Sequence, residues 1–329
     1  MTQLSEKQLI IEKVMKNIFY NPNSRKSFNL VIKNFALNLQ DIWDGSSAND
    51  LIPENQKYVN KPSIVIGRGP SLKKNNHLKI LADSNFDGNI VCCDGALKSA
   101  LDAGVTPDKF PNFYVVTIDP GEKFYTFYDH EIIDHYGHKI KGFFSTVIHP
   151  KTVSRIKNNN ISFFWLHSLL DYNEGEKSFN SISAIMTRSK KHITGLPAIQ
   201  TGGNVGTSAW FISWKILKSN LISLIGIDHG WLPDDPFEKI ITHGNTSKSI
   251  GIKKDDEIYK KFFPTVHNTD LDCDCILDPI FNYYRTALIE FIQRSPSEIQ
   301  TINCTEGGSI FGQRIKSMKF DDFLLSNRK

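Results

Sequence analysis

The segment Gly67-Arg68-Gly69-Pro70-Ser71 combines groups that suit phosphate binding, and it directly follows the apolar run at residues 63–66. Two glycines let a backbone approach a ligand closely, and Ser71 can cap a following helix whose first N–H groups attract anions. Arg68 adds a planar cation that matches phosphate oxygens. The segment lacks the GK[ST] ending of a Walker loop and the third glycine of the dinucleotide fingerprint. It therefore predicts either a phosphate-binding turn or a tight strand-to-helix turn that binds nothing.

Two carboxylates follow the next two apolar runs: Asp94 comes after residues 89–93, and Asp119 comes after residues 113–118. In an open parallel sheet the carboxyl ends of the strands share one edge, and ligands bind there. Asp94 and Asp119 are therefore expected to converge and to hold a Mg²⁺ ion that bridges phosphate oxygens. The alternative is that each aspartate is only the N-cap of the next helix.

A second glycine-rich segment, TGGNVGTS at residues 201–208, precedes an apolar helical stretch. Two such helix entrances in one α/β domain suggest a ligand of extended anionic or polar character. The candidate ligand-binding residues here are glycines and residues with hydrogen-bonding side chains: Gly202, Gly203, Asn204, Gly206 and Thr207. Close packing of a helix on the sheet is the alternative role for Gly202 and Gly206.

Asp228 and His229 follow a further apolar run at residues 221–226. Asp228 is expected to complete a metal site or to accept a hydrogen bond from a ligand hydroxyl, and His229 to act as an acid, a base or a phosphate partner. A histidine in a loop is as often a bystander. With Asp119, these two residues are the catalytic candidates. Glu306 follows the run at residues 299–303 and is expected to reach the same rim.

These segments stand at the ends of short apolar runs that alternate with helical stretches. The runs are rich in β-branched and aromatic residues and lie at residues 63–66, 89–93, 113–118, 143–147, 161–165 and 221–226. The helical stretches lie at residues 72–81, 96–103, 205–218 and 279–293, with a further helix at the end of the sequence. This alternation predicts an α/β fold with a doubly wound, mostly parallel, Rossmann-like sheet that is buried on both faces.

Residues 1–60 have a different pattern and are expected to form an N-terminal helical extension. Apolar residues recur at helical spacing in two stretches separated by Asn-Pro-Asn-Ser at residues 21–24, and residues 44–53 are expected to be a linker. Residues 61–329 then form the catalytic domain, with a long irregular loop region at about 230–277. The N-terminal helices either serve homo-oligomerisation or pack on the sheet.

Composition limits the classes of protein that fit. The chain has 329 residues, of which 40% are hydrophobic and 22% charged, so it can bury a core. No apolar run approaches the ~20 residues of a membrane span, and the first residues do not form a secretory signal. The net charge of +4 suits anionic small molecules and is too small to argue for nucleic-acid binding. Five cysteines do not suggest a disulfide framework, so we expect a cytoplasmic protein.

The motifs IVIGRGPSL, CCDGALKSALDAGVTPD, VVTIDP, TGGNVGTSAW and LIGIDHGW occur in an order that resembles the archaeal MptE-like 6-hydroxymethylpterin diphosphokinase family. Relatives of that family include the motility-associated (Maf) flagellin glycosyltransferases, and the later segment NCTEGGSIFG is closer to that branch. The resemblance implies Mg²⁺-dependent transfer of diphosphate from the co-substrate ATP to 6-hydroxymethyl-7,8-dihydropterin, with release of AMP. The alternatives are a Maf-like glycosyltransferase that uses a nucleotide-activated acidic sugar, and a nucleotide-binding module without activity.

The resemblance also implies roles for individual residues. The glycine turn would hold the nucleotide or its phosphates, Asp94 and Asp119 would form the metal–phosphate centre, and residues 202–207 would form the opposite wall, with Asp228 and His229 beside them. The chain departs from the family pattern in three ways: it has about 60 residues before the glycine turn, a long charged region after Trp231, and Arg68 inside the turn.

Overall fold

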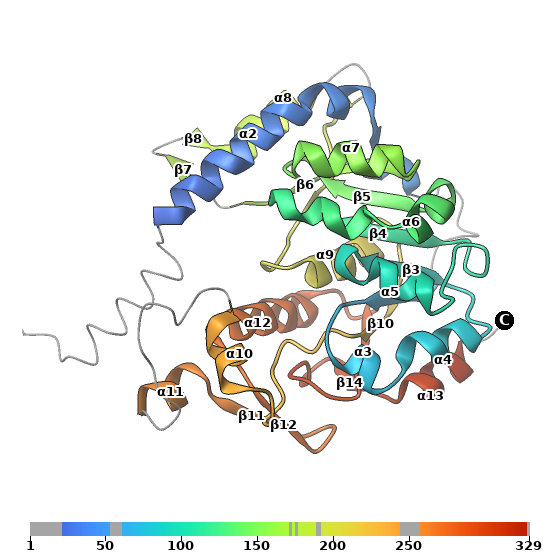
Figure 1. Cartoon of the computed structure of the whole chain (residues 1–329), viewed down its shortest axis with the longest axis vertical. Helices are drawn as coiled ribbons and strands as arrows, with labels where there is room; N and C mark the ends of the chain where they lie inside the picture. Colours follow the sequence, from blue (N-terminus) through green and yellow to red (C-terminus); the bar gives the residue numbers. More distant parts are fainter. Residues whose placement is uncertain are drawn as a thin grey trace, which may run out of the picture.

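The computed structural model describes residues 22–52, 61–170, 173–174, 177–188, 192–243 and 257–327. Within these residues, ten strands form one sheet in the order β1-β6-β5-β4-β3-β2-β10-β13-β14, with β9 beside β6 (Figure 1). The strand pairs described in this sheet are parallel. The strands are β1 (Ser46–Ser47), β2 (Ser63–Ile66), β3 (Asn89–Cys93), β4 (Phe113–Thr117), β5 (Lys141–Ser145), β6 (Ser162–Ser168), β9 (Ala198–Ile199), β10 (Leu221–Ile225), β13 (Gln300–Asn303) and β14 (Ile315–Ser317).

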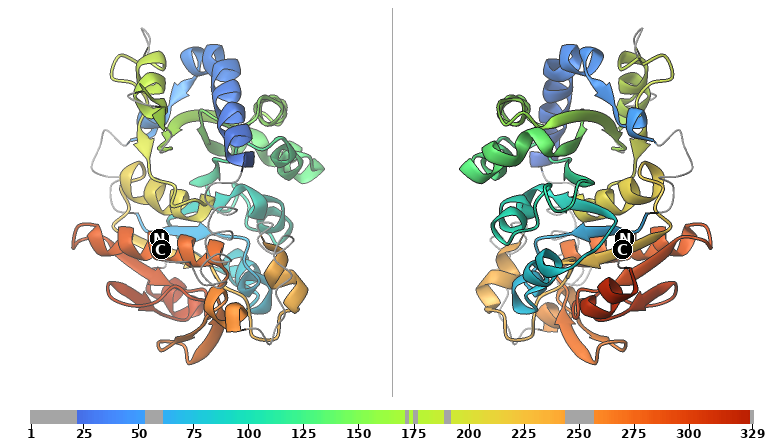
Figure 2. Two further views of the ribbon diagram at one scale, coloured as in Figure 1. Left: turned by 90° about the vertical axis from the view of Figure 1, so that its left-hand side faces the viewer. Right: turned by 90° about the vertical axis from the view of Figure 1, so that its right-hand side faces the viewer.

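Helices cover both faces of the sheet (Figure 2). Trp210 of α9 and Leu288 of α12 belong to the apolar core on one face, and Leu81 of α4, Ala100 of α5 and Ile156 of α7 belong to the core on the other. The helices around the sheet are α2 (Pro22–Asp44), α3 (Ser71–Lys74), α4 (His77–Asp83), α5 (Leu97–Asp102), α6 (Glu131–Tyr136), α7 (Pro150–Asn158), α8 (Phe179–Met186), α9 (Val205–Lys215), α12 (Pro279–Arg294) and α13 (Phe320–Ser326).

The central strands show why the sequence pattern predicts this fold. Every residue of β2, β3 and β4 is buried, because apolar side chains on both sides of each strand meet a layer of helices. Continuous apolar runs rather than alternating ones are what such strands require. The predicted doubly wound parallel sheet is confirmed.

The order of the strands places a topological switch point between β2 and β10. From β2 the chain adds β3, β4, β5 and β6 outward on one side of the sheet. It then returns through α9 and adds β10, β13 and β14 on the other side of β2. The connections at the carboxyl ends of β2 and β10 therefore leave in opposite directions, which is where open α/β sheets bind ligands.

The N-terminal region joins the sheet more closely than the sequence predicts. The first of the two expected helices lies outside the described residues, whereas the second is α2, which begins at Pro22 and buries Val31, Phe35 and Ile42. The expected linker at residues 44–53 contains β1, which pairs with β6, and a 3₁₀ turn at Ala48–Leu51. A two-residue strand is too short to leave a periodic pattern, so the sequence does not reveal this pairing.

The segment expected to be a long loop contains regular elements. These are α10 (Phe237–Thr242), α11 (Glu257–Phe262) and an antiparallel hairpin of β11 (Thr265–Asn268) and β12 (Cys273–Ile276). Ile240, Tyr259 and Phe263 are buried in a small apolar cluster of their own. The elements are short and widely spaced along a charged segment, so no hydrophobic period marks them. A small hairpin, β7 (Asn173–Glu174) with β8 (Lys177–Ser178), precedes α8.

Among the described residues, none of the helices combines the length and the apolar composition that a membrane-spanning segment needs. The five cysteines are free thiols, and all except Cys273 are buried.

Candidate functional site

The glycine turn after β2 is held directly against β10. The N–H of Gly67 donates to the carbonyl of Ile225 and the N–H of Gly69 to that of Gly226, both at 2.8 Å, so the β2–β10 pairing continues beyond the two strands. A Cβ on Gly67 would lie 2.2 Å from the carbonyl oxygen of Gly226, so only glycine permits this approach. Both N–H groups are bonded within the protein. This differs from the expected phosphate cradle, because these two glycines serve close packing.

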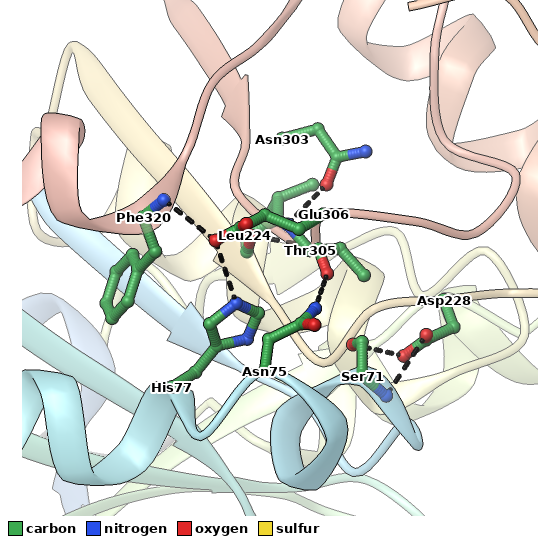
Figure 3. Close-up of polar contacts among 9 residues, drawn as sticks. All are labelled: Ser71, Asn75, His77, Leu224, Asp228, Asn303, Thr305, Glu306 and Phe320. Carbon is green, nitrogen blue, oxygen red and sulfur yellow. Dashed lines mark hydrogen bonds and ion pairs between the residues drawn. The ribbon is translucent and has the colours of Figure 1, made fainter. Parts of the chain in front are cut away.

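Ser71 and Asp228 are hydrogen-bonded at the switch point (Figure 3). The Ser71 hydroxyl donates to Oδ2 of Asp228 at 2.8 Å, and the Ser71 N–H donates to Oδ1 at 3.3 Å. Ser71 is the first residue of α3, so its side chain does not cap that helix as expected; Asp228 contacts the helix start instead. Asp228 is only 8% exposed, and burial raises its pKa to about 6 although the bonds from Ser71 lower it.

The two predicted carboxylates follow neighbouring strands of the sheet: Asp94 comes directly after β3, and Asp119 stands two residues after β4. Cys93 pairs with Val116, which places Asp94 beside the last residues of β4. Asp94 is 5% exposed, and burial raises its pKa to about 7; the negative charge of Asp119 raises it further, while hydrogen bonds from Gly95 and Thr117 lower it. Burial also raises the pKa of Asp119. Two carboxylates in one poorly solvated place favour a bound cation.

Arg68 of the glycine turn lies beside the turn that carries Asp94. Its guanidinium lies 5.3 Å from the centre of the Phe127 ring, and its side chain would be 3.0 Å from a Cβ on Gly95. Its positive charge lowers the pKa of Asp94. The side chain is exposed, so the same guanidinium can contact a phosphate at this edge.

The donor set at this edge fits a divalent cation that also binds phosphate. Oδ1 of Asp94 accepts from the N–H of Gly95 at 2.7 Å, and Oδ1 of Asp119 accepts from the N–H of Gly121 at 2.9 Å. In the described part of the chain, no group of three or more His, Cys, Asp or Glu side chains is arranged to hold a metal ion. Mg²⁺ is commonly bound by one or two carboxylates together with phosphate oxygens and water. The two aspartates match that pattern and not a metal site formed by protein ligands alone.

The second glycine-rich segment forms the start of α9. Gly202 and Gly203 have φ of +52° and +80°, which glycine adopts readily. Oδ1 of Asn204 caps the helix by accepting from the N–H of Thr207 at 2.9 Å, and the Thr207 side chain is buried. A Cβ on Gly206 would lie 2.7 Å from the Ile227 side chain, so this glycine packs closely against the end of β10. In the first turn of α9 the N–H groups of Thr207 and Ser208 already donate to Asn204, so an anion at this helix start would be bound by those of Val205 and Gly206.

His229 is buried in an uncharged state. The residue is 8% exposed, its Nδ1 has no hydrogen-bond partner among the residues that the structure describes, and burial lowers its pKa to about 4. It is therefore neutral near pH 7, and a role as a positively charged phosphate partner does not fit. A neutral imidazole can still exchange hydrogen bonds with a ligand. Its backbone has φ of +41°, an uncommon conformation for a histidine.

Helix α12 contacts two of the candidate segments, which the sequence analysis does not predict. The Tyr284 ring lies 5.8 Å from the His229 ring and would be 2.7 Å from a Cβ on Gly203. Burial raises the pKa of Tyr284 to about 12, and the charge of Asp119 adds to this shift. The helix is capped by Asp278, which also accepts from Trp231 Nε1 at 2.6 Å. Asp-Pro before an aromatic run marked the helix start in the sequence, but nothing marked the face that meets the site.

Glu306 does not reach the carboxylate pair. Its Oε1 lies 3.3 Å from His77 Nε2 and accepts from the N–H of Phe320 at 3.1 Å, while Asn75 donates to the carbonyl of Thr305 (Figure 3). Glu306 therefore connects α4 with the start of α13. Glu306 follows β13 at the same edge of the sheet, but its carboxylate is already bonded to His77 and to the start of α13.

A surface pocket of about 460 Å³ lies at the opposite edge of the sheet. Its lining comes from residues just before β2, β3 and β4, including Lys61, Gly88 and Asn112. None of the predicted site residues contributes to it. Of its charged lining residues, Lys61 is paired with Asp87 at 2.6 Å, and Lys109 donates to the carbonyl of Ala82. The pocket therefore lies apart from the predicted chemistry.

The chain resembles known proteins in both sequence and fold. A solved structure, the Maf glycosyltransferase from Magnetospirillum magneticum AMB-1, shares the fold with a TM-score of 0.55 at 15% identity. The similarity covers 88% of this chain but 41% of that structure, so the chain spans less than half of that protein. No curated protein matches the sequence. The family described as 6-hydroxymethylpterin diphosphokinase MptE-like matches residues 33–234, which is more than half of the chain, and the chain therefore belongs to the MptE-like family.

Proposed function

We propose that this protein is a transferase that acts on a nucleotide polyphosphate, and specifically that it transfers diphosphate from ATP to 6-hydroxymethyl-7,8-dihydropterin with release of AMP. The observation that carries the proposal is that two poorly solvated carboxylates, Asp94 and Asp119, follow neighbouring strands at the carboxyl edge of the sheet, where the charge of Asp119 acts on Asp94. The family description names this activity, and the Maf structure with the same fold is also a transferase.

The chain's own groups have separable roles in this proposal. Asp94 and Asp119 would hold Mg²⁺, which when bound neutralises charge on the phosphate oxygens. Arg68, whose charge acts on Asp94, and the first turn of α9 supply positive potential at this edge of the sheet, and this suits a ligand with several phosphates. Phosphoryl transfer needs little covalent help from the protein, so alignment and electrostatics carry the catalysis.

The acceptor hydroxyl needs a hydrogen-bond acceptor that aligns it for in-line attack. Asp119 is the more accessible of the two carboxylates, whereas Asp228 is bonded to Ser71 and His229 is buried beside Tyr284. We assign the alignment to Asp119. Asp228 then keeps the glycine turn in place, and His229 contributes a neutral imidazole beside Tyr284.

The test is to incubate the protein with ATP, Mg²⁺ and the reduced pterin and to measure AMP and the diphosphorylated pterin. We expect turnover that falls about 100-fold or more in Asp94→Asn and Asp119→Asn. Asp108→Asn, on an exposed aspartate paired with Lys139, is the matched control and should keep the wild-type rate. No AMP from the wild-type protein under these conditions would overturn the pterin reaction.

A second candidate is a glycosyltransferase that uses a nucleotide-activated acidic sugar. One observation favours this candidate. The fold shared with the Maf structure covers 88% of the chain, which is more than the residues 33–234 that the family matches. Turnover of a CMP-sugar without AMP formation from ATP would support this reaction instead. Nucleotide binding that is unchanged in Asp94→Asn and Asp119→Asn, with no turnover of either donor, would indicate a binding module.

A further inference from the structure

Asn34 of α2 connects that helix to two loops at the carboxyl edge of the sheet. Its side-chain Nδ2 donates to the carbonyl of Pro120 at 2.9 Å and to the carbonyl of Val147 at 3.0 Å. The residue is 1% exposed, and its bond to Val147 is buried while its bond to Pro120 is partly buried. Pro120 follows β4 and Val147 follows β5, and Asn34 thus holds the ends of two neighbouring strands.

The bond to Pro120 bears directly on Asp119. The peptide unit between Pro120 and Gly121 accepts from Asn34 at its oxygen, and its N–H, that of Gly121, donates to Oδ1 of Asp119 at 2.9 Å. A peptide unit is planar, so fixing the direction of its oxygen also fixes the direction of its N–H. Hydrogen bonds at the two ends of one amide also strengthen each other through polarisation.

We propose that Asn34 is a positioning residue for Asp119: through the Pro120–Gly121 peptide it sets the orientation of the carboxylate at the candidate metal–phosphate site. That Asn34 sets the orientation of Asp119 does not depend on the proposed function. That this orientation matters for metal binding does depend on it. Asn34 lies on α2. Its two hydrogen bonds go to Pro120 and Val147, which we do not assign to ligand binding. It acts as an outer partner that orients a ligating carboxylate, a role whose loss typically weakens metal binding by about 10–100-fold.

Asn38 provides a matched control on the same helix. It lies one turn after Asn34, is also 1% exposed, and its Nδ2 also donates to two carbonyls, those of Thr146 at 3.2 Å and Ile148 at 2.8 Å. Its partners lie in the loop after β5 only. Loss of either asparagine side chain removes a donor from two carbonyls that are buried or partly buried, so the two variants should be destabilised to a similar extent.

The experiment compares Asn34→Ala with Asn38→Ala by three measurements. Thermal unfolding should show similar losses for both. Mn²⁺ binding in the presence of α,β-methylene-ATP should weaken about 10–100-fold in Asn34→Ala and change less than about threefold in Asn38→Ala. Titration of the Asp119 carboxyl carbon by NMR should show a higher pKa in Asn34→Ala only, because the N–H of Gly121 that lowers this pKa is no longer held in place.

The outcomes separate the two proposals. Equal Mn²⁺ affinities and equal Asp119 titrations in the two variants would overturn the positioning role. If the wild-type protein binds no Mn²⁺ with the nucleotide, the proposed function fails, and the Asp119 titration alone decides the role of Asn34. If an alanine variant does not fold, the near-isosteric pair Asn34→Leu and Asn38→Leu replaces it. Folding of Asn38→Leu but not of Asn34→Leu would show a structural role for Asn34 and would also overturn the proposal.

Discussion

Ser71 and Asp228 are 157 residues apart in sequence, yet the Ser71 hydroxyl donates to Asp228 Oδ2 at 2.8 Å and ties the turn after β2 to the end of β10. Gly69 lies beside this hydrogen bond, and its lack of a side chain makes the contact possible. A Cβ on Gly69 would lie 1.7 Å from Oδ2 of Asp228. The bond crosses the switch point of the sheet. The geometry of the candidate site therefore depends on it.

Ser71→Ala should raise the pKa of Asp228 further above its value of about 6, because the carboxylate loses a donor that stabilises its charge. The free energy of unfolding should fall by about 1.5–3 kcal/mol at pH 7.5, where the bond is charge-assisted, and by less at pH 5. Urea unfolding at the two pH values measures this, with Ser71→Thr as the control that keeps a hydroxyl. A loss that is larger at pH 5 than at pH 7.5 would contradict this account.

Gly69→Ala should destabilise the fold by about 1–3 kcal/mol, because the new methyl group overlaps the Asp228 carboxylate and lies 2.8 Å from the carbonyl of Gly226. Gly307→Ala is the comparison: it is also in a loop at the sheet edge, and a Cβ added there would have no described atom within 4 Å. That variant should change the free energy by about 0.5 kcal/mol or less. Equal melting temperatures for the two variants would show that the close approach is not needed.

Asp94→Asn should stabilise the protein at pH 8 but not at pH 4. The folded-state pKa of Asp94, about 7, exceeds its ordinary value of 3.8, so the stability linked to this group is fully present below pH 4 and is lost as the pH rises through 7. The Asp94→Asn variant avoids this loss of stability. At about 1.36 kcal/mol per pKa unit, the loss is on the order of 4 kcal/mol.

The check is urea unfolding of both proteins from pH 4 to pH 8 without divalent cations. The curve of the wild-type protein should fall over this range more steeply than that of Asp94→Asn. Parallel curves would show that Asp94 is not held in the poorly solvated place beside Asp119. The same variant should lose Mg²⁺-dependent nucleotide binding, so the charge that lowers stability is the one that the proposed function requires.

The amino-acid sequence is sufficient to predict the sheet and the edge at which the candidate groups gather. Continuous apolar runs followed by Gly67, Asp94, Asp119 and Asp228 are enough for this, because parallel strands buried on both faces must be apolar throughout and their carboxyl ends share one side. These are local patterns, and they do not depend on how distant segments pack.

Packing in three dimensions determines which of these groups face each other and which are already bonded. Four contacts join segments far apart in the chain. They are the bonds from the Gly67 and Gly69 N–H groups to the end of β10, the bond of Glu306 to α13, the approach of Tyr284 to His229, and the bond from Asn34 to Pro120. A hydrogen bond of this kind is set by distances of a few tenths of an ångström between packed elements, and residue type and spacing carry no record of it.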